Sequence, residues 1–198
     1  MSSAPLSWKA DVSKSIPHVE IRWFAFATIA IIGAGLDLWT KQTVFDWRGI
    51  PGSSQPWWVI NGYVGIETAV NLGALFGMGA GFGSVFATLS ILAAIAILVW
   101  LSRFRAIESW WLLVALGCVM GGIGGNLYDR LGLWYQPNFP PEWKSGVRDW
   151  ILLRYQQYTW PNFNIADSLL VCGAIMLAIH SFMTPASQDL TQPIESKQ

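Results

Sequence analysis

The stretch FGSVFATLSILAAIAILVWL, residues 82–101, decides the fold class. It contains no Asp, Glu, Lys or Arg, and it is as long as a helix that crosses the hydrocarbon core of a bilayer, which needs roughly 20 apolar residues. Similar apolar runs occupy residues 23–39, 109–127 and 166–183, and their centres are also free of charge. We therefore expect an α-helical membrane protein with four transmembrane helices.

The composition supports a single membrane domain. Of the 198 residues, 53% are hydrophobic and only 12% are charged, whereas soluble domains carry about 25% charged residues. Lys plus Arg equals Asp plus Glu at 12 each, so no net field favours nucleic acid or an acidic partner. We expect one integral membrane domain over residues 1–198, with a leader at 1–21 and a tail at 184–198.

Particular residue types mark the ends and the faces of the four runs. Tryptophan favours the headgroup layer of a bilayer, and it stands at run ends as Trp23, Trp39, Trp100, Trp110 and Trp111. Glycine recurs every four residues at Gly117, Gly121 and Gly125, which forms a stripe that lets a neighbouring helix approach closely. We interpret Cys118 and Cys172, which lie inside runs, as packing residues and not as metal ligands.

The number of spans fixes which loops share a side. Four spans place the leader, the short loop 102–108 and the tail on one side, and the long loops 40–81 and 128–165 on the other. Lys and Arg are split six against six between the sides, so their count does not orient the chain. The pair Arg103 and Arg105 in the short loop favours a cytoplasmic N-terminus. Within 40–81, β-branched and aromatic residues nearly alternate, which predicts a short pair of strands on the membrane surface.

Polar residues gather on the long-loop side, close to the ends of the spans. Taken singly, each fits a helix cap or an ion pair; Asn164 and Asp167, three residues apart, fit a capping-box-like pattern well. Together they favour a functional site, because ionisable groups at the edge of a membrane are costly. The members are Asp37, Lys41, Asn71, Asn126, Asp129, Arg130, Asp149, Asn164 and Asp167.

The residue types restrict the chemistry of such a site. The chain has two histidines, His18 and His180, and neither belongs to the polar group, which disfavours a His-ligated metal, a haem and a rhomboid-like serine protease. Two neighbouring aspartates share a proton, so that one acts as a base for water and the other as an acid toward a carbonyl oxygen. This pattern favours peptide hydrolysis. The alternative is a non-enzymatic transporter or scaffold subunit with a polar rim, although such proteins more often place carboxylates near the midplane.

Five short motifs give the chain a resemblance to a known family. They are DLWTK at 37–41, NLGALF at 71–76, GNLYDR at 125–130, GVRDWI at 146–151 and FNIADS at 163–168. In type, order and placement on four spans they resemble the motifs of the lipoprotein signal peptidase family, also called signal peptidase II. The resemblance runs from Asp37 into the fourth apolar run.

The resemblance implies an aspartyl endopeptidase of the bacterial inner membrane that cuts prolipoproteins before a diacylglyceryl-modified cysteine. Its termini would be cytoplasmic, its active site would face the periplasm, and 40–81 would form a β-cradle on the outer face. The family acts without a cofactor or metal, usually as a monomer, and is blocked by globomycin-type peptides. The resemblance makes Asp149 and Asp167 the catalytic pair. It assigns supporting or substrate-binding roles to Asp37, Lys41, Asn71, Gly73, Asn126, Asp129, Arg130, Asn164 and Ala166.

The chain departs from the family pattern between Asp129 and Asp149. The intervening segment 131–148 is longer than usual and rich in Pro and aromatic residues, and we expect an ordered surface loop that rims the substrate cleft. Arg148 stands where the family has an apolar residue. In an extended segment its side chain would point away from that of Asp149.

The sequence also assigns roles within the aspartate pair. Asp167 is expected in the first turn of a helix, where the dipole and free N–H groups favour negative charge. We therefore predict that Asp167 is the base and that Asp149 is the initial acid, within a pair that titrates as a unit.

Overall fold

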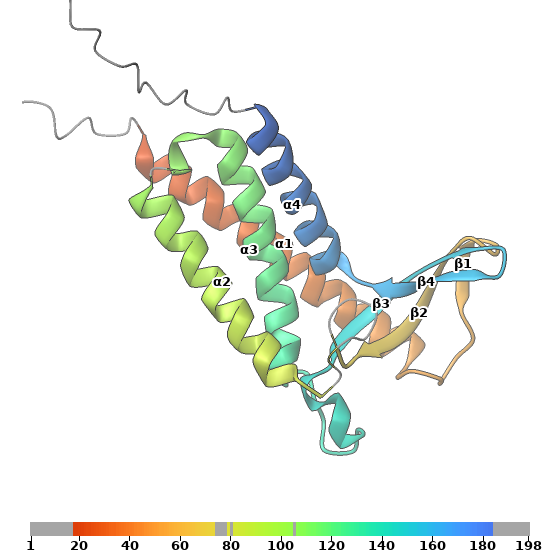
Figure 1. Ribbon diagram of the computed structural model, residues 1–198. Coiled ribbons are helices and arrows are strands. Elements are labelled where there is room, and N and C mark those ends of the chain that lie inside the picture. The colour runs from red at the N-terminus through yellow and green to blue at the C-terminus, as the bar shows by residue number, and fades with distance from the viewer. Residues whose placement is uncertain (1–17, 74–78, 80, 105, 184–198) are drawn as a thin grey trace, which may run out of the picture.

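The structure is a computed structural model that describes residues 18–73, 79, 81–104 and 106–183 (Figure 1). Within these residues, four helices are long and apolar enough to cross a membrane, and a four-stranded antiparallel sheet lies beyond one end of the bundle. The expected fold class, a four-helix membrane protein with a small sheet, is confirmed. The helices are α1 (Val19–Arg48), α2 (Gly83–Arg103), α3 (Trp110–Arg130) and α4 (Ile165–Met183).

Helix α1 is longer than the apolar run that predicted it. It begins at Val19, inside the expected leader, and continues to Arg48, inside the expected loop 40–81. The helix continues beyond its apolar residues because two charged side chains there, Asp37 and Lys41, lie one turn apart and form an ion pair. The other three helices end within three residues of the predicted bounds. Residues 1–17 of the expected leader and 184–198 of the expected tail lie outside the described residues.

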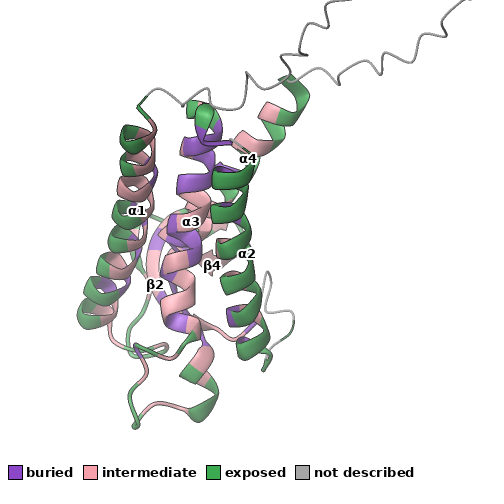
Figure 2. Ribbon diagram, turned by 90° about the vertical axis from the view of Figure 1, so that its left-hand side faces the viewer, coloured by how far each residue is buried: buried purple, intermediate pink, exposed green. Residues whose placement is uncertain are grey.

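Helix α3 forms the centre of the bundle. It packs against α1, α2 and α4, and it contains more buried residues than any of the other three helices (Figure 2). The core combines Leu112, Leu113 and Leu116 of α3 with Phe26 of α1 and Ile97 of α2. Much of the surface of α2 and α4 is exposed and apolar, as expected of helices that face lipid.

The glycine stripe of α3 faces α1, and the predicted close approach of a neighbouring helix is confirmed. A Cβ atom at any of the three positions would press against α1, because the two backbones approach closely. The nearest neighbours of Gly117, Gly121 and Gly125 are, in that order, Ile29, Ala30 and Asp37. The last contact places this stripe directly below the polar residues at the end of the bundle.

Gly122, on the side of α3 that faces α4, is packed as closely against that helix, and we predict that Gly122→Ala destabilises the protein. A Cβ atom there would lie 2.5 Å from the Ala166 carbonyl oxygen and 2.7 Å from Leu170 Cγ. Backbone cannot yield to such a clash without moving α4, so we expect a loss of about 1–3 kcal/mol in the free energy of unfolding. Thermal unfolding in detergent measures it.

Gly35→Ala is the matched control, because a Cβ atom at Gly35 would meet nothing within 4 Å. It should leave stability unchanged or slightly improved, since Ala favours a helix over Gly. Equal unfolding temperatures for the two variants would contradict close packing of α3 against α4.

The sheet combines strands from both long loops. Its order is β1-β2-β3-β4 and all neighbours are antiparallel. Strands β1 (Trp57–Ile60) and β2 (Val64–Asn71) are the pair predicted within 40–81. Strands β3 (Val147–Tyr155) and β4 (Tyr158–Phe163) were not predicted. They join at Gln156, whose φ of 54° makes the tight turn.

The segment 131–148 is ordered, as expected, and is fixed by its aromatic residues, whereas its expected place on the rim of the substrate cleft stays a prediction. The buried ring of Trp134 packs against Phe45 of α1 and against Phe139, at centroid distances of 5.9 and 5.6 Å. Its Nε1–H donates to the Gly146 carbonyl at 2.9 Å. A short 3-10 helix, η3 (Pro141–Ser145), closes the segment. These contacts hold the start of β3 against the ends of α1 and α3.

Candidate active site

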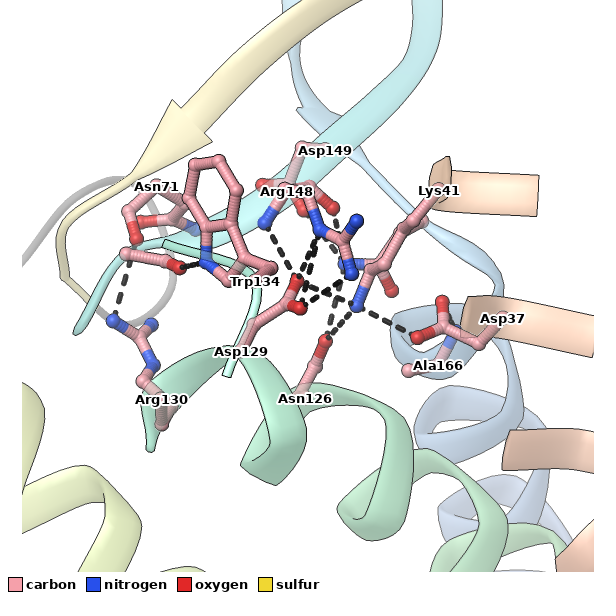
Figure 3. Close-up of polar contacts among 12 residues, drawn as sticks. Asp37, Lys41, Asn71, Asn126, Asp129, Arg130, Trp134, Arg148, Asp149 and Ala166 are labelled. Carbon is pink, nitrogen blue, oxygen red and sulfur yellow. Dashed lines mark hydrogen bonds and ion pairs between the residues drawn. The ribbon is translucent and has the colours of Figure 1, made fainter. Parts of the chain in front are cut away.

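The polar residues converge where the helix ends meet the sheet (Figure 3). Asp37 and Lys41 come from α1, and Asn126 and Asp129 from the last turns of α3. Asp149 lies near the start of β3, at a position that pairs with Ala69 of β2. Asn164 alone separates β4 from α4, whose first turn carries Asp167. Groups that are far apart in the sequence thus form one connected cluster.

Lys41 is the centre of a buried charge network. Its side chain is fully buried, and its Nζ lies 2.7 Å from Asp37 Oδ2 and 3.3 Å from Asp129 Oδ2. The same Nζ donates to Asn126 Oδ1 at 3.0 Å. An ammonium has three N–H donors, and these three acceptors match them. The network therefore compensates a charge that burial alone would make very costly.

Both carboxylates in this network, Asp37 and Asp129, also accept a hydrogen bond from a backbone N–H. Asp37 Oδ1 accepts from the N–H of Ala166 at 2.9 Å, which fixes the first turn of α4 to α1. Asp129 Oδ2 accepts from the N–H of Arg148 at 2.9 Å, which fixes the start of β3 to α3. Ala166 contributes to the cluster through this N–H. The network thus positions the two segments that carry Asp149 and Asp167.

Arg148 completes the network on the side away from Asp149. Its Nη2 and Nε lie 2.8 and 3.2 Å from Asp129 Oδ1, and its Nη1 donates to Gln42 Oε1 at 3.1 Å. The guanidinium carbon lies 5.3 Å from the centroid of the Trp134 ring. The β-strand alternation points the side chains of Arg148 and Asp149 in different directions, as the sequence predicted. The partners Gln42 and Trp134 were not predicted, because the strand β3 itself was not.

Two asparagines join Asp149 to Asp167. Asn164 Nδ2 donates to Asp149 Oδ1 at 2.6 Å and to Asn126 Oδ1 at 3.1 Å. Asn126 Nδ2 in turn donates to Asp167 Oδ1 at 2.8 Å. The two carboxyl groups therefore belong to one continuous hydrogen-bond chain.

Asn164 also caps α4 in the pattern that the sequence predicted. Its Oδ1 accepts from the N–H of Asp167 at 2.9 Å, and its own N–H donates to Asp167 Oδ2 at 3.2 Å. This reciprocal pair satisfies free N–H groups at the helix start. It also fixes the rotamer of Asp167, whose carboxylate faces the positive end of the helix dipole.

The surroundings of Asp149 favour its neutral form. Burial, followed by the negative charge of Asp167, raises the pKa of Asp149 to about 8, although the Lys41 charge and hydrogen bonds with Asn164 and Asn71 act in the opposite direction. A side chain with this pKa carries a proton at neutral pH. The pair can thus supply one acid and one base at the same time.

Arg130, Asn71 and Gly73 form a second group beside the first. Arg130 donates through Nη1 to the carbonyls of Ser145 and Asn71 at 2.9 and 3.3 Å and through Nη2 to that of Gly73. The Gly73 N–H donates to Asn71 Oδ1 at 3.0 Å. Arg130 therefore holds the end of β2 so that the Asn71 side chain reaches Asp149. Residues 74–76 of the NLGALF motif lie outside the described residues.

A cavity of about 360 Å³ lies beside Asp149. One side is formed by the second half of β2, and the other by Pro161 and Asn162 of β4, with Pro51 after α1. It is large enough to admit part of an extended peptide. The arrangement combines an acid, a base and a neighbouring space for a chain, which is what hydrolysis of a peptide bond requires.

Comparisons with known proteins show which family and which fold this chain is similar to. A family model described as signal peptidase (SPase) II matches residues 29–183. The chain is 60% identical over 162 residues to a lipoprotein signal peptidase of Rhodopirellula baltica, covering 81% of this chain and 73% of the relative. It is 38% identical over 136 residues to a lipoprotein signal peptidase of Pseudomonas putida, covering 66% and 72%. A solved structure described as a bacterial membrane enzyme superposes with a TM-score of 0.68 at 25% identity, covering 88% of this chain and 95% of that one.

Proposed function

This chain belongs to the signal peptidase II family, aspartic-type peptidases of bacterial membranes that remove signal peptides from prolipoproteins, and we propose that Asp149 and Asp167 are its catalytic pair. The observation that carries the proposal is the hydrogen-bond chain from Asp149 through Asn164 and Asn126 to Asp167. The raised pKa of Asp149 supports its role as the initial acid. The position of Asp167 at the start of α4 supports its role as the base.

In the proposed reaction a water molecule is bound between the two carboxyl groups. Asp167 takes a proton from the water, whose oxygen attacks the carbonyl carbon of the scissile peptide, while Asp149 protonates the carbonyl oxygen. The tetrahedral intermediate collapses when Asp149 recovers that proton and Asp167 delivers its proton to the leaving nitrogen. Each carboxyl group then has its original protonation state, and the peptide C–N bond is broken.

The other predicted residues act by holding this pair. Lys41, Asp37 and Asp129 fix the start of α4 and of β3. Asn126 and Asn164 fix the two carboxyl groups, and Arg130 with Gly73 and Asn71 fixes the wall of the cavity beside them. We place these residues in supporting roles, with Asn71, Asn126 and Asn164 in direct contact with the two carboxyl groups.

The proposed setting is the bacterial inner membrane, with both termini cytoplasmic and the active site toward the periplasm. The leader 1–21 and the tail 184–198 would then be cytoplasmic parts of one domain. The sheet lies at one end of the bundle (Figure 1), and the polar cluster lies where the helices meet this sheet (Figure 3), which supports this arrangement. In it the sheet forms a β-cradle over the outer leaflet, and the diacylglyceryl group of the substrate stays in lipid. We propose that the protein acts as a monomer without a metal or other cofactor.

Cleavage of a defined substrate tests the proposed site. The purified protein, in detergent or lipid, is incubated with a diacylglyceryl-modified prolipoprotein, with and without globomycin. We expect release of the signal peptide immediately before the modified cysteine, and inhibition by globomycin. Cleavage of the unmodified precursor at the same rate would contradict recognition of the lipid.

The protonated state of Asp149 also predicts a pH dependence. Because the proposed acid must carry its proton, kcat/KM should fall as the pH rises through about 8, the pKa of Asp149, by about tenfold for each further pH unit. Initial rates between pH 6 and 10 measure this, and unfolding temperatures over the same range serve as the control for stability. A rate that increases through pH 8 would contradict the assignment of Asp149 as the acid.

A further inference from the structure

The cavity beside Asp149 contains a second carboxylate that the proposed reaction does not use. Glu67 of β2 and Asn162 of β4 both line the cavity, and both are half-buried. Their strands are separated by β3 in the sheet. Asn162 Nδ2 nevertheless donates to the Glu67 carbonyl at 3.0 Å and to its carboxylate Oε2 at 3.3 Å.

Two β-bulges explain how side chains of non-neighbouring strands meet. Between Ile66 and Ala69, β2 has one more residue than the facing part of β3, and Glu67 lies in this irregularity. The pairing of β3 with β4 has a second irregularity opposite 160–163, which includes Asn162. A bulge bends its strand and redirects a side chain. The two bulges together turn Glu67 and Asn162 toward the same cavity.

The Glu67 carboxylate can accept further hydrogen bonds from a ligand. In the described part of the chain, Asn162 is the hydrogen-bond partner of the Glu67 carboxylate, and no cation pairs with it. A carboxylate offers about four acceptor positions, so capacity for hydrogen bonds remains. Glu67 thus presents a fixed negative charge to whatever enters the cavity.

The position of Glu67 indicates which part of a substrate it meets. The inference rests on the proposed function, in which the apolar signal segment and the lipid remain beside the helices. The polar chain after the modified cysteine must then leave the site over the sheet (Figure 1), and the cavity is lined by residues of β2 and β4 of this sheet. Glu67 would therefore face the first residues of the mature lipoprotein.

We propose that Glu67, held by Asn162, is a specificity-determining residue that favours Lys or Arg in the first residues after the modified cysteine and disfavours Asp or Glu there. The attraction acts on binding and not on the chemical step, so it should change KM more than kcat. Because Glu67 is half-buried, solvent and salt screen the interaction. The discrimination is therefore modest and decreases as the salt concentration rises.

Three matched substrates test the proposal. They are diacylglyceryl lipopeptides that differ only at the two residues after the cysteine. Both residues are Lys in the first peptide, Ala in the second and Glu in the third. With the wild-type protein at low salt, we expect kcat/KM for the Lys peptide to exceed that for the Glu peptide by about 5- to 10-fold. Glu67→Gln should reduce this ratio to within about twofold, and Glu67→Lys should reverse it. The Ala peptide should be cleaved at similar rates by all three proteins.

Two further variants test whether the preference depends on the Glu67 charge inside the cavity or on the loss of any carboxylate. Glu142→Gln removes an exposed carboxylate of η3, outside the cavity, and should retain the wild-type ratio. Asn162→Ala should lower the ratio while the Ala peptide is still cleaved, because the Glu67 side chain is no longer held. Equal kcat/KM for the Lys and Glu peptides with wild-type protein, or an unchanged ratio in Glu67→Gln, would overturn the proposal. Failure of the wild-type protein to cleave even the Ala peptide would instead contradict the proposed function.

Discussion

Replacement of either Asp149 or Asp167 by Asn should abolish cleavage of a diacylglyceryl-modified prolipoprotein. Asn is nearly the same shape as Asp but can neither accept a proton from water nor donate one to a carbonyl oxygen. Loss of one positioned acid or base costs about 10²- to 10⁴-fold in rate, and we expect the upper end because each group acts in both halves of the reaction. Single-turnover cleavage with excess protein gives the necessary sensitivity.

The two variants should remain folded. Asp149 is neutral at neutral pH, since its pKa is raised to about 8, and Asn preserves this neutral state. Asn at 167 keeps an amide oxygen that can accept from Asn126. Unfolding temperatures should therefore stay close to that of the wild-type protein. Asp46→Asn provides the matched control, because Asp46 is an exposed aspartate of α1 that accepts a hydrogen bond from Gln42 Nε2 at 2.9 Å. It should be fully active.

The comparison with Asp129 decides whether the correct aspartate of the long loop has been chosen. The motif GNLYDR makes Asp129 the more conspicuous candidate, and the segment 131–148 separates it from Asp149. If Asp149→Asn retained activity while Asp129→Asn lost it without unfolding, the catalytic pair would have to be reassigned to Asp129 and Asp167.

Asp129→Asn should have the second large effect, which is on stability. Asp129 is fully buried and its carboxylate serves both Lys41 and Arg148. Removal of one partner from a buried ion pair leaves charge without compensation and costs about 3–5 kcal/mol. We expect a loss of this size in the free energy of unfolding, measured in detergent by thermal or chemical denaturation. The folded fraction should retain reduced cleavage activity, because Asp129 fixes the start of β3 but takes no part in the proposed proton transfers.

A double-mutant cycle with Arg148 tests the physical cause. Arg148→Gln alone should also destabilise the protein, because it leaves Asp129 with less positive charge around it. The double variant Asp129→Asn/Arg148→Gln should lose less than the sum of the two single variants, since neither charge then remains unpaired. Strictly additive losses would show that the pair contributes through packing and not through charge.

The four helices could be predicted because a membrane imposes a simple pattern on the sequence. Apolar runs such as 82–101 have a minimum length and exclude charge from their centres, and the structure places a helix on each. The extension of α1 to Arg48 was missed. A charged pair such as Asp37 and Lys41 normally indicates the end of a span, whereas here it lies inside the helix and is buried against α3.

The polar cluster could be predicted from its position at one side of the membrane, but its internal order could not. Strands β3 and β4 carry charged residues and a proline within their hydrophobic pattern, at Arg148, Asp149, Arg154 and Pro161. These hide the alternation that would identify strands. Without β3 the sequence gives no reason to pair Arg148 with Asp129, and without the bulges it gives no reason to bring Glu67 toward Asn162.

The junction at Asn164 connects the sheet, which lies beyond the end of the bundle, to α4, one of the four helices that can cross a membrane. One residue connects the last strand of the sheet to α4. The rotation of α4 about its own axis is therefore fixed relative to the sheet. A single residue added there would turn the following helix by about 100°, since an α-helix has 3.6 residues per turn. Asp167 would then turn away from Asn126, which now donates to its carboxylate. Selection can accordingly lengthen the exposed turn 136–138 within the segment 131–148, while the spacing from β4 to Asp167 must remain constant.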